Sequence, residues 1–382
     1  MKNPLVALLF LTITLFLSNC NTNCHDAGKK HYLIGGKIVS VNLSKDSIIS
    51  IYDLFDKIEL IPLDSCANLN GDNNICYVFS GAENLFLFQK SNNPKIYKFD
   101  ANGRLINVIR QGRRRDEVIS PQDIIWNQFI NTIDILEGNY KILSFDEKTL
   151  EFVRTTNIPA ASSIIRRIIP ADSTSYIGFC YEKCNRLTMI KNGYILPFNQ
   201  CYSTSPEWSF WTCFHNGFSP FFFDDGKSCY FESQGMNIYE IDRNSLTIRP
   251  IISWDFGDAQ FYINDIDSTQ NEVFYYKLWK SGNYKYATPF FRICSFNNYI
   301  LAEIYYKGYA TIILNKENNQ AFPVKTKEGI PILASPYIIN ETMYSVVHKS
   351  ALPKFAKVGT QDSVKSQDTS FYIIKLHIKK NI

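Results

Sequence analysis

The sequence predicts an all-β protein, a six-bladed β-propeller of four-stranded blades, from three observations. Aromatic residues make up 15% of the 382 residues, with 28 Phe and 23 Tyr against 4 Met, a composition that favours strands over helices. Short apolar or β-branched runs alternate with turn residues along most of the chain. A strand–turn–strand phrase also recurs at an interval close to the about 40 to 50 residues of a propeller blade.

The recurring phrase is a strand of alternating apolar residues, a polar turn and a second strand. Its four copies are 95–105, 141–151, 237–247 and 311–319. Asp100 and Asp146, at the turns of the first two copies, are 46 residues apart, and Asp242 follows 96 residues later. Because 96 is about two periods, we expect a degenerate blade between the second and third copies, at Ile165 to Leu196.

Counting this repeat along the chain gives six blades. We expect them near 75–110, 121–157, 164–200, 219–256, 289–325 and 335–380. One small sheet cannot cover its own apolar faces, so neighbouring blades must stack around a ring. Two N-terminal strands, Ile48–Ile51 and Lys57–Leu63, have no hairpin partner, and we expect one of them to close the ring by pairing with Phe371–Ile378. A β-sandwich is the alternative, but it explains neither the period nor the unpaired N-terminal strands.

The first nineteen residues predict an export signal. Lys2 precedes an apolar run from Leu5 to Leu17, which is shorter than the about 20 residues of a membrane-spanning helix. The run ends in Leu17-Ser18-Asn19-Cys20, which resembles a bacterial lipobox, so we expect cleavage to leave a lipidated Cys20. A plain signal peptide cut near Asn23 is the alternative.

The signal divides the chain into three parts and assigns a location. Residues 1–19 are the predicted lipoprotein signal peptide, 20–46 a tether and N-terminal segment, and 47–382 the propeller. The predicted location is the bacterial cell envelope, on the outer membrane or the periplasmic face, with membrane contact through the lipid anchor. The formal net charge of +4 gives no strong field, so no nucleic-acid partner is expected.

Cysteines and histidines do not predict a metal or disulfide framework. Nine cysteines besides Cys20 have irregular spacing, which favours buried free thiols for most of them, although Cys180 and Cys184 are close enough to face each other across a hairpin. There is no CxxC pair and the five histidines are scattered, so no metal site is predicted. No cofactor is predicted either, and a calcium ion in the central channel has no support in the sequence.

The repeat resembles the six-bladed β-propeller lipoproteins of Bacteroides-type bacteria, which are themselves similar to NHL-repeat propellers. The best-matching segment is Ile96–Leu105, followed by Ile109–Gly112 and Glu117, with arginines in place of the glycines and proline of the family's loop. Asn237–Ile241 resembles a second phrase of the family, and Glu272–Tyr286 resembles its insert before the fifth blade. The resemblance implies the propeller fold and an envelope location, and it supplies no catalytic residues.

A basic loop follows the first blade. It is a candidate anion-binding loop for a carboxylate, sulfate or phosphate group, made by Arg110, Arg113, Arg114 and Arg115. The alternative is a solvated loop that Asp116 and Glu117 partly neutralise.

Two aromatic groups form a candidate binding surface for a sugar or a peptide. They contain Trp208, Trp211, Tyr275, Tyr276 and Trp279. The alternative is that these rings fill space between blades, because aromatic side chains supply large buried areas.

No linear catalytic motif is present: we find no GxSxG elbow, Walker loop, HExxH or GxGxxG. The sequence therefore favours a non-catalytic binding module for a protein or glycan partner in the envelope. The alternative is a channel-centred hydrolase or lyase that acts on glycans or peptides, and a structural accessory of a transport complex is a third hypothesis. Acids or histidines from three or more blades that converge at the channel would favour the enzyme.

Overall fold

The computed structural model describes most of the chain from Gly36 onward. The described residues are 36–67, Leu69, 75–80, 84–89, 94–109, Gly112, 117–138, 140–159, 165–180, 187–198, 219–232, 237–260, 285–287, 292–332, Ser335, 337–354 and 370–379.

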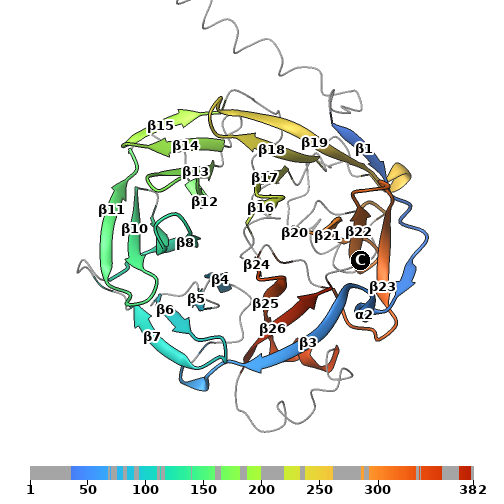
Figure 1. Ribbon diagram of the computed structural model, residues 1–382, viewed down its shortest axis with the longest axis horizontal. Helices are drawn as coiled ribbons and strands as arrows, with labels where there is room; N and C mark the ends of the chain where they lie inside the picture. Colours follow the sequence, from blue (N-terminus) through green and yellow to red (C-terminus); the bar gives the residue numbers. More distant parts are fainter. Residues whose placement is uncertain are drawn as a thin grey trace, which may run out of the picture.

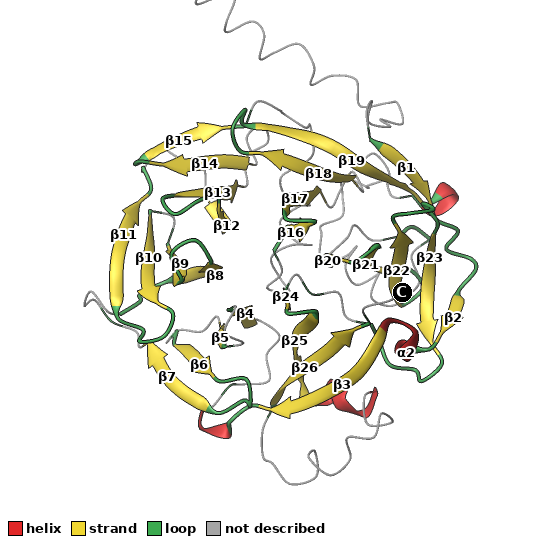
Figure 2. Cartoon of the chain, viewed as in Figure 1, coloured by secondary structure: helices red, strands yellow, loops and turns green. Residues whose placement is uncertain are grey.

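Six small antiparallel sheets stand around a central axis, as Figure 1 and Figure 2 show. In each blade the strands are given from the innermost to the outermost. Blade 1 contains β4 (Ile75–Phe79), β5 (Leu85–Gln89), β6 (Ile96–Phe99) and β7 (Leu105–Ile109). Blade 2 contains β8 (Pro121–Asn127), β9 (Thr132–Glu137), β10 (Lys141–Asp146) and β11 (Phe152–Asn157). Blade 3 contains β12 (Ile165–Pro170), β13 (Ser175–Cys180), β14 (Leu187–Lys191) and β15 (Tyr194–Pro197).

The second half of the ring has the same order. Blade 4 contains β16 (Phe221–Asp224), β17 (Lys227–Glu232), β18 (Asn237–Asp242) and β19 (Thr247–Asp255). Blade 5 contains β20 (Arg292–Phe296), β21 (Tyr299–Tyr305), β22 (Tyr309–Asn315) and β23 (Ala321–Thr326). Blade 6 contains β24 (Ile338–Ile339), β25 (Thr342–His348), β26 (Phe371–Ile378) and β3 (Phe55–Pro62). The predicted fold class, the six blades and the degenerate third blade are confirmed.

The ring closes where the N-terminal strand β3 pairs antiparallel with the C-terminal strand β26. The register runs from Pro62 opposite Tyr372 to Ile58 opposite Leu376. Glu59 Oε1 lies 2.8 Å from Lys57 Nζ on its own strand and, across the pair, 2.7 Å from His377 Nε2 of β26. The predicted closure is confirmed, and of the two candidate segments it is Lys57–Leu63 that provides the closing strand.

The segment before β3 runs along the outside of the ring as two added strands. β1 (Lys37–Ser40) pairs parallel with β19 of blade 4, and β2 (Ser47–Ile49) pairs parallel with β23 of blade 5. β1 lies within the predicted tether and N-terminal segment, so the sheet of blade 4 includes residues upstream of the predicted propeller boundary at residue 47. Neither parallel pairing was expected from the sequence.

A short capped helix connects the added strands to the closing strand. α2 (Ile51–Leu54) begins at Ser50, whose Oγ accepts a hydrogen bond from the amide of Tyr52 at 3.3 Å. The amide of Ser50 donates to Asp53 Oδ2 at 2.8 Å, which completes a capping box. Glu328, which follows blade 5, accepts from Ser50 Oγ at 2.5 Å and ties this helix to the ring.

The core lies between the blades, because each sheet is covered on both faces by its neighbours. The middle strands β9 and β13 are therefore buried at every residue, whereas the outermost strand β11 alternates between half-buried and exposed positions. Among the described residues, the 3-10 helices η1 (Ser65–Ala67), η2 (Gly257–Ala259) and η4 (Lys349–Lys354) lie in connections. Of the predicted insert Glu272–Tyr286, only Lys285 and Tyr286 are among the described residues.

In the part of the chain that the structure describes, no helix has the length and apolar character needed to cross a membrane. Cys180, Cys229 and Cys294 are buried free thiols, as expected for most of the cysteines. Cys184, the suggested hairpin partner of Cys180, lies outside the described residues.

Candidate functional site

The four copies of the sequence phrase form equivalent turns between the third and outermost strands of blades 1, 2, 4 and 5. In each turn a side-chain oxygen accepts hydrogen bonds from backbone amides two to four residues later, which is the usual role of Asp and Asn in turns. The acceptors are Asp100, Asp146, Asp242 and Asn315. A residue with positive φ completes each turn, and these are Gly103, Leu150, Leu246 and Asn319.

In blades 2, 4 and 5 the residue that follows the turn acceptor reaches the preceding blade. In blade 2 this residue is Glu147, whose Oε1 accepts from Ser80 Oγ at 2.7 Å and from Asn84 Nδ2 at 2.5 Å in blade 1. In blade 5 it is Lys316, whose Nζ lies 2.9 Å from Asp224 Oδ1 in blade 4. These polar contacts join neighbouring blades on the face of the ring that carries the turns.

At the junction of blades 3 and 4 the equivalent residue is Arg243. Its guanidinium donates to the carbonyl oxygen of Ala171 in blade 3 and, at 2.5 Å, to Ser228 Oγ in its own blade. Both acceptors are neutral, so these hydrogen bonds hold the Arg243 side chain in place without neutralising its charge. This junction therefore differs from the Lys316–Asp224 junction, where the bridging cation meets a carboxylate.

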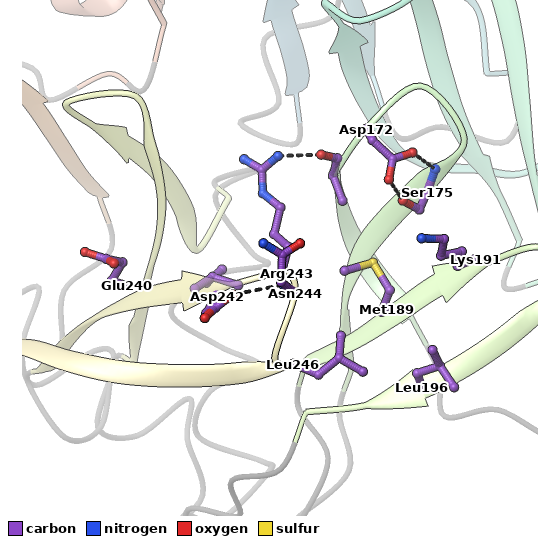
Figure 3. A pocket seen from close by; sticks show the side chains of 12 residues that line it. Asp172, Ser175, Met189, Lys191, Leu196, Glu240, Asp242, Arg243, Asn244 and Leu246 are labelled. Atoms are coloured by element: carbon purple, nitrogen blue, oxygen red, sulfur yellow. Dashed lines mark hydrogen bonds between the residues drawn. The ribbon is translucent and has the colours of Figure 1, made fainter.

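A cavity of about 600 Å³ opens beside Arg243, between blades 3 and 4 (Figure 3). Blade 3 contributes the turn after β12 and side chains of β14 and β15, and blade 4 contributes the end of β18 and the turn that follows. The lining residues are Ala171, Asp172, Ser175, Met189, Lys191, Leu196, Glu240, Ile241, Asp242, Arg243, Asn244 and Leu246.

Strand register explains how blade 3 lines its side of the cavity. Met189 and Lys191 are two residues apart on β14, so they lie on the same face of the sheet. Leu196 of β15 is the cross-strand partner of Met189 and shares that face. Met189 is buried, whereas Leu196 remains 41% exposed, so the cavity has an aliphatic surface that is partly open to solvent.

Two carboxylates of the cavity stay ionised because their own turns stabilise the charge. Burial alone would raise the pKa of Asp172, but hydrogen bonds from Ser175 and Thr174 outweigh it and lower the pKa to about 2. Hydrogen bonds from Ser245 and Asn244 lower the pKa of Asp242 below its ordinary value. Both side chains therefore carry a negative charge near neutral pH.

The other charged groups of the cavity differ in their pairing. Glu240 Oε2 lies 2.9 Å from Lys227 Nζ and 3.0 Å from Arg249 Nη2, so its charge is balanced outside the cavity. Lys191 is exposed and has no hydrogen-bond or ion-pair partner among the described residues. Within the same part of the chain, no ion pair joins Lys191 or Arg243 to Asp172 or Asp242. The cavity thus presents two cations and two anions that do not neutralise one another by direct contact.

A buried ion pair joins the innermost strands of blades 2 and 3. Arg167 of β12 is 1% exposed, and its Nη1 lies 3.3 Å from Asp123 Oδ1 of β8 and 3.1 Å from the carbonyl oxygen of Gln122. The other oxygen of Asp123 accepts from the backbone amide of Ile168 at 2.9 Å. These contacts join the inner strands of blades 2 and 3, and their role is structural.

A second ion pair lies within blade 5. Arg292 Nε of β20 is 3.5 Å from Glu303 Oε2 of β21, and the Glu303 side chain is fully buried. Among the described residues no group of three or more His, Cys, Asp and Glu side chains is arranged to hold a metal ion.

The site residues expected from the sequence lie outside the described residues. This holds for the anion-binding loop, for the aromatic surface and for the lipidated cysteine: Arg110, Arg113, Arg114, Arg115, Trp208, Trp211, Tyr275, Tyr276, Trp279 and Cys20. Next to the basic loop, Gly112 and Glu117 are described. A Cβ at Gly112 would overlap the Glu117 carboxylate, so this position requires glycine unless the Glu117 side chain moves.

The cavity was not predicted from the sequence, although one of the turns that line it was. The recurring phrase predicted the turn at Asp242, and Asp172-Ser173-Thr174-Ser175 is a visible turn signal. The sequence offered no signal that these two turns, 70 residues apart, would meet Lys191 across a blade junction.

The chain belongs to the family described as 6-bladed beta-propeller (DUF5128), whose profile matches residues 32–338. Among solved structures it is similar to a candidate exported protein of Bacteroides fragilis, with a TM-score of 0.67 and 11% identity over 90% of this chain and 100% of that chain. It is also similar to a member of the DUF4221 family from Bacteroides vulgatus, with a TM-score of 0.50 and 11% identity over 85% of this chain and 97% of that one. No curated protein matches the sequence. At these identities the likeness concerns the fold.

Proposed function

We propose that this chain is an exported, lipid-anchored propeller of the bacterial cell envelope that binds a ligand or partner without transforming it. The N-terminal apolar run and the Leu17–Cys20 motif support export and lipidation at Cys20. The similarity to a candidate exported protein of Bacteroides fragilis is consistent with this location. The lipid would hold the ring at a membrane surface and leave its loops and turns accessible.

The observation that carries the binding role is the cavity between blades 3 and 4. It combines charges that are not neutralised within the cavity with an aliphatic surface, and it sits on a rigid scaffold of two packed sheets. Pre-formed cavities of this kind, with a few convergent polar groups, are typical of binding sites. On the innermost strands of blades 2 and 3, Arg167 and Asp123 instead pair with each other.

The loops that connect one blade to the next provide a second surface for a protein or glycan partner. Arg110, Arg113, Arg114 and Arg115 are the candidates for contact with an anionic group. Trp208, Trp211, Tyr275, Tyr276 and Trp279 are the candidates for stacking against a sugar or peptide. Loops on a rigid ring vary without disturbing the stacked blades, which suits a binding module.

Lipidation is tested with Cys20→Ser, and Cys24→Ser, four residues away, is the matched control. Each full-length protein is expressed in a Gram-negative host with labelled palmitate, and membrane and soluble fractions are compared. We expect the wild type and Cys24→Ser to be labelled and sedimented with membranes, and Cys20→Ser to carry no label. Labelled Cys20→Ser in the membrane fraction would contradict the anchor.

Binding and catalysis are separated by one incubation. The immobilised full-length protein is exposed to glycan and peptide fractions of cell envelopes, and both retention and the appearance of new reducing ends, unsaturated sugars or free amines are measured. We expect retention of material with no new products. Products that accumulate with time would favour the hydrolase or lyase alternative, and unchanged retention by the Arg113→Ser/Arg114→Ser/Arg115→Ser variant would exclude the basic loop as the contact.

A further inference from the structure

We propose that the cavity between blades 3 and 4 binds a short peptide by both of its charged ends, with its amino group at Asp172 and Asp242 and its carboxylate at Lys191 and Arg243. This inference rests on the proposed binding function and specifies the ligand class of that site. Peptide here means a molecule of about two to four residues with free termini and an aliphatic side chain.

The first argument is the separation of the charges. Lys191 has no partner among the described residues, and Arg243 is held by the Ala171 carbonyl and the Ser228 hydroxyl, which leave its charge unbalanced. Among the described residues, Asp172 and Asp242 accept hydrogen bonds only from neutral groups of their own turns. A ligand that carries one charge would be attracted by one pair of groups and repelled by the other pair. A zwitterion is attracted by both pairs, each at its oppositely charged end.

The second argument compares this junction with others on the same face. Between blades 4 and 5 the bridging residue Lys316 meets Asp224 at 2.9 Å, so that junction is neutralised internally. Between blades 1 and 2, Lys98 Nζ donates to the carbonyl oxygens of Glu147 and Lys148 at 2.7 and 2.9 Å; burial lowers the pKa of Lys98, and the charges of Glu147 and Asp146 act in the opposite direction. At the junction of blades 3 and 4 the described cavity residues Lys191, Arg243, Asp172 and Asp242 carry charges of both signs, and no ion pair joins them.

The third argument excludes other ligand classes. None of the twelve described lining residues is aromatic, so the cavity lacks the flat rings on which sugars stack. A neutral sugar would also leave all four charges without a counterpart. A folded partner protein needs an interface of about 1,000 Å² or more with an apolar centre, whereas this site is a hollow between two turns.

The fourth argument is size and shape. A volume of about 600 Å³ lies within the range of small-molecule sites, about 300 to 1,000 Å³, and accommodates a few residues. Met189 and Leu196 of blade 3 and Leu246 of blade 4 provide an aliphatic surface between the charged turns (Figure 3). We therefore expect an aliphatic side chain to occupy this surface while the two ends of the peptide meet the charged groups.

The test is calorimetric titration of the purified full-length protein in detergent with the dipeptide leucyl-leucine. The matched probes are its N-acetyl form, its C-terminal amide and the doubly blocked form, each of which lacks one or both charges. We expect leucyl-leucine to bind and each singly blocked form to bind about tenfold more weakly, because one charge-assisted hydrogen bond contributes about a factor of ten. Equal affinity for all four probes would overturn the proposal.

Two variants locate the binding. Lys191→Gln removes the unpaired cation, and Asp242→Asn removes a negative charge while keeping an acceptor oxygen for the turn, as Asn315 does at the equivalent position of blade 5. We expect each to weaken leucyl-leucine binding about tenfold. The controls are Lys95→Gln, an exposed lysine of blade 1, and Asp146→Asn, the equivalent turn of blade 2, both with unchanged affinity.

The variants also show whether the two ends are recognised separately. Lys191→Gln should narrow the difference between the free dipeptide and its C-terminal amide, and Asp242→Asn should narrow the difference between the free dipeptide and its N-acetyl form. Wild-type protein that binds none of the probes, or variants that bind like the wild type, would overturn the peptide site. Envelope material would still be retained in that case if the loops carry the binding, so the failure of this inference is distinct from the failure of the proposed function.

Discussion

Replacing Gly103 with alanine should weaken the closure of the ring. Gly103 lies in the turn of blade 1 with φ +78°, and a Cβ there would overlap the carbonyl oxygen of Pro62, the last residue of the closing strand β3. The Gly103 carbonyl also accepts from the amide of Asp64 at 2.8 Å, so the turn cannot move away without losing that contact. The positive φ costs alanine about 1 kcal/mol and the overlap about 2 kcal/mol more, which gives about 3 kcal/mol in all.

Gly226→Ala is the matched control for this substitution. Gly226 has φ +76°, nearly the same as Gly103, but nothing lies within 4 Å of a Cβ at that position. Equilibrium unfolding in urea at constant m-value should therefore give a loss of about 1 kcal/mol for Gly226→Ala and about 3 kcal/mol for Gly103→Ala. Equal losses would refute the argument that the turn of blade 1 is packed against the closing strand.

Three further substitutions or reactions follow from the described contacts. Asp172 has a folded pKa of about 2 against an ordinary value of 3.8, so its stabilising contribution is present above about pH 4 and is lost as the pH falls toward 2. The free energy of unfolding should therefore drop less between pH 4 and pH 2 in Asp172→Asn than in the wild type. Equal drops in the two proteins would contradict the lowered pKa. Arg167→Met should lower the free energy of unfolding in urea by about 3 to 5 kcal/mol, because it leaves Asp123 buried without its cation. Adding Asp123→Asn should recover part of this loss. A loss below about 1 kcal/mol for Arg167→Met would show that the ion pair is dispensable. Burial raises the pKa of Cys229 and of Cys294 to about 12, so neither thiol should react with a thiol-specific reagent at pH 8 until the protein unfolds. Reaction is measured by peptide mapping of the labelled protein. A label on either cysteine in the native protein would contradict their burial.

The propeller was predictable because each copy of the repeat forms its hairpin from residues that are close together in the sequence. An Asp or Asn, a turn and two flanking strands recur in sequence, and each copy folds into the same hairpin with the same hydrogen bonds to its acceptor, as at Asp146. The predicted second blade, 121–157, coincides with β8 to β11. Closure was predictable by elimination, because a strand such as Lys57–Leu63 with no hairpin partner needs a distant one.

The parallel strands on the outside of the ring were not predictable from such local patterns. β2 pairs with β23, nearly 300 residues later in the chain, and no turn between them fixes a register. Ile48 of β2 is 67% exposed, so hydrophobic burial gives little indication of its partner. The sequence predicts a strand at Ile48–Ile51. The strand with which β2 pairs depends on the position of the outer edge of blade 5 in the folded ring.

The candidate site was only partly predictable, because its residues come from blades that meet only in the folded protein. The turn at Asp242 is part of the repeat, but Asp172 and Lys191 reach the cavity only because blade 3 packs beside blade 4. Motif searches favour dense runs such as Arg113–Arg115, whereas the cavity is built from single charges on separate turns. The basic loop and the two aromatic groups remain predictions, since they lie outside the described residues.

The most direct test of the binding account is a crystal structure of the full-length protein grown with leucyl-leucine. The account predicts electron density for the dipeptide between blades 3 and 4, with its amino group within hydrogen-bond distance of Asp172 and Asp242 and its carboxylate within that distance of Lys191 and Arg243. Well-ordered dipeptide at another place on the ring, with this cavity filled by water alone, would contradict it.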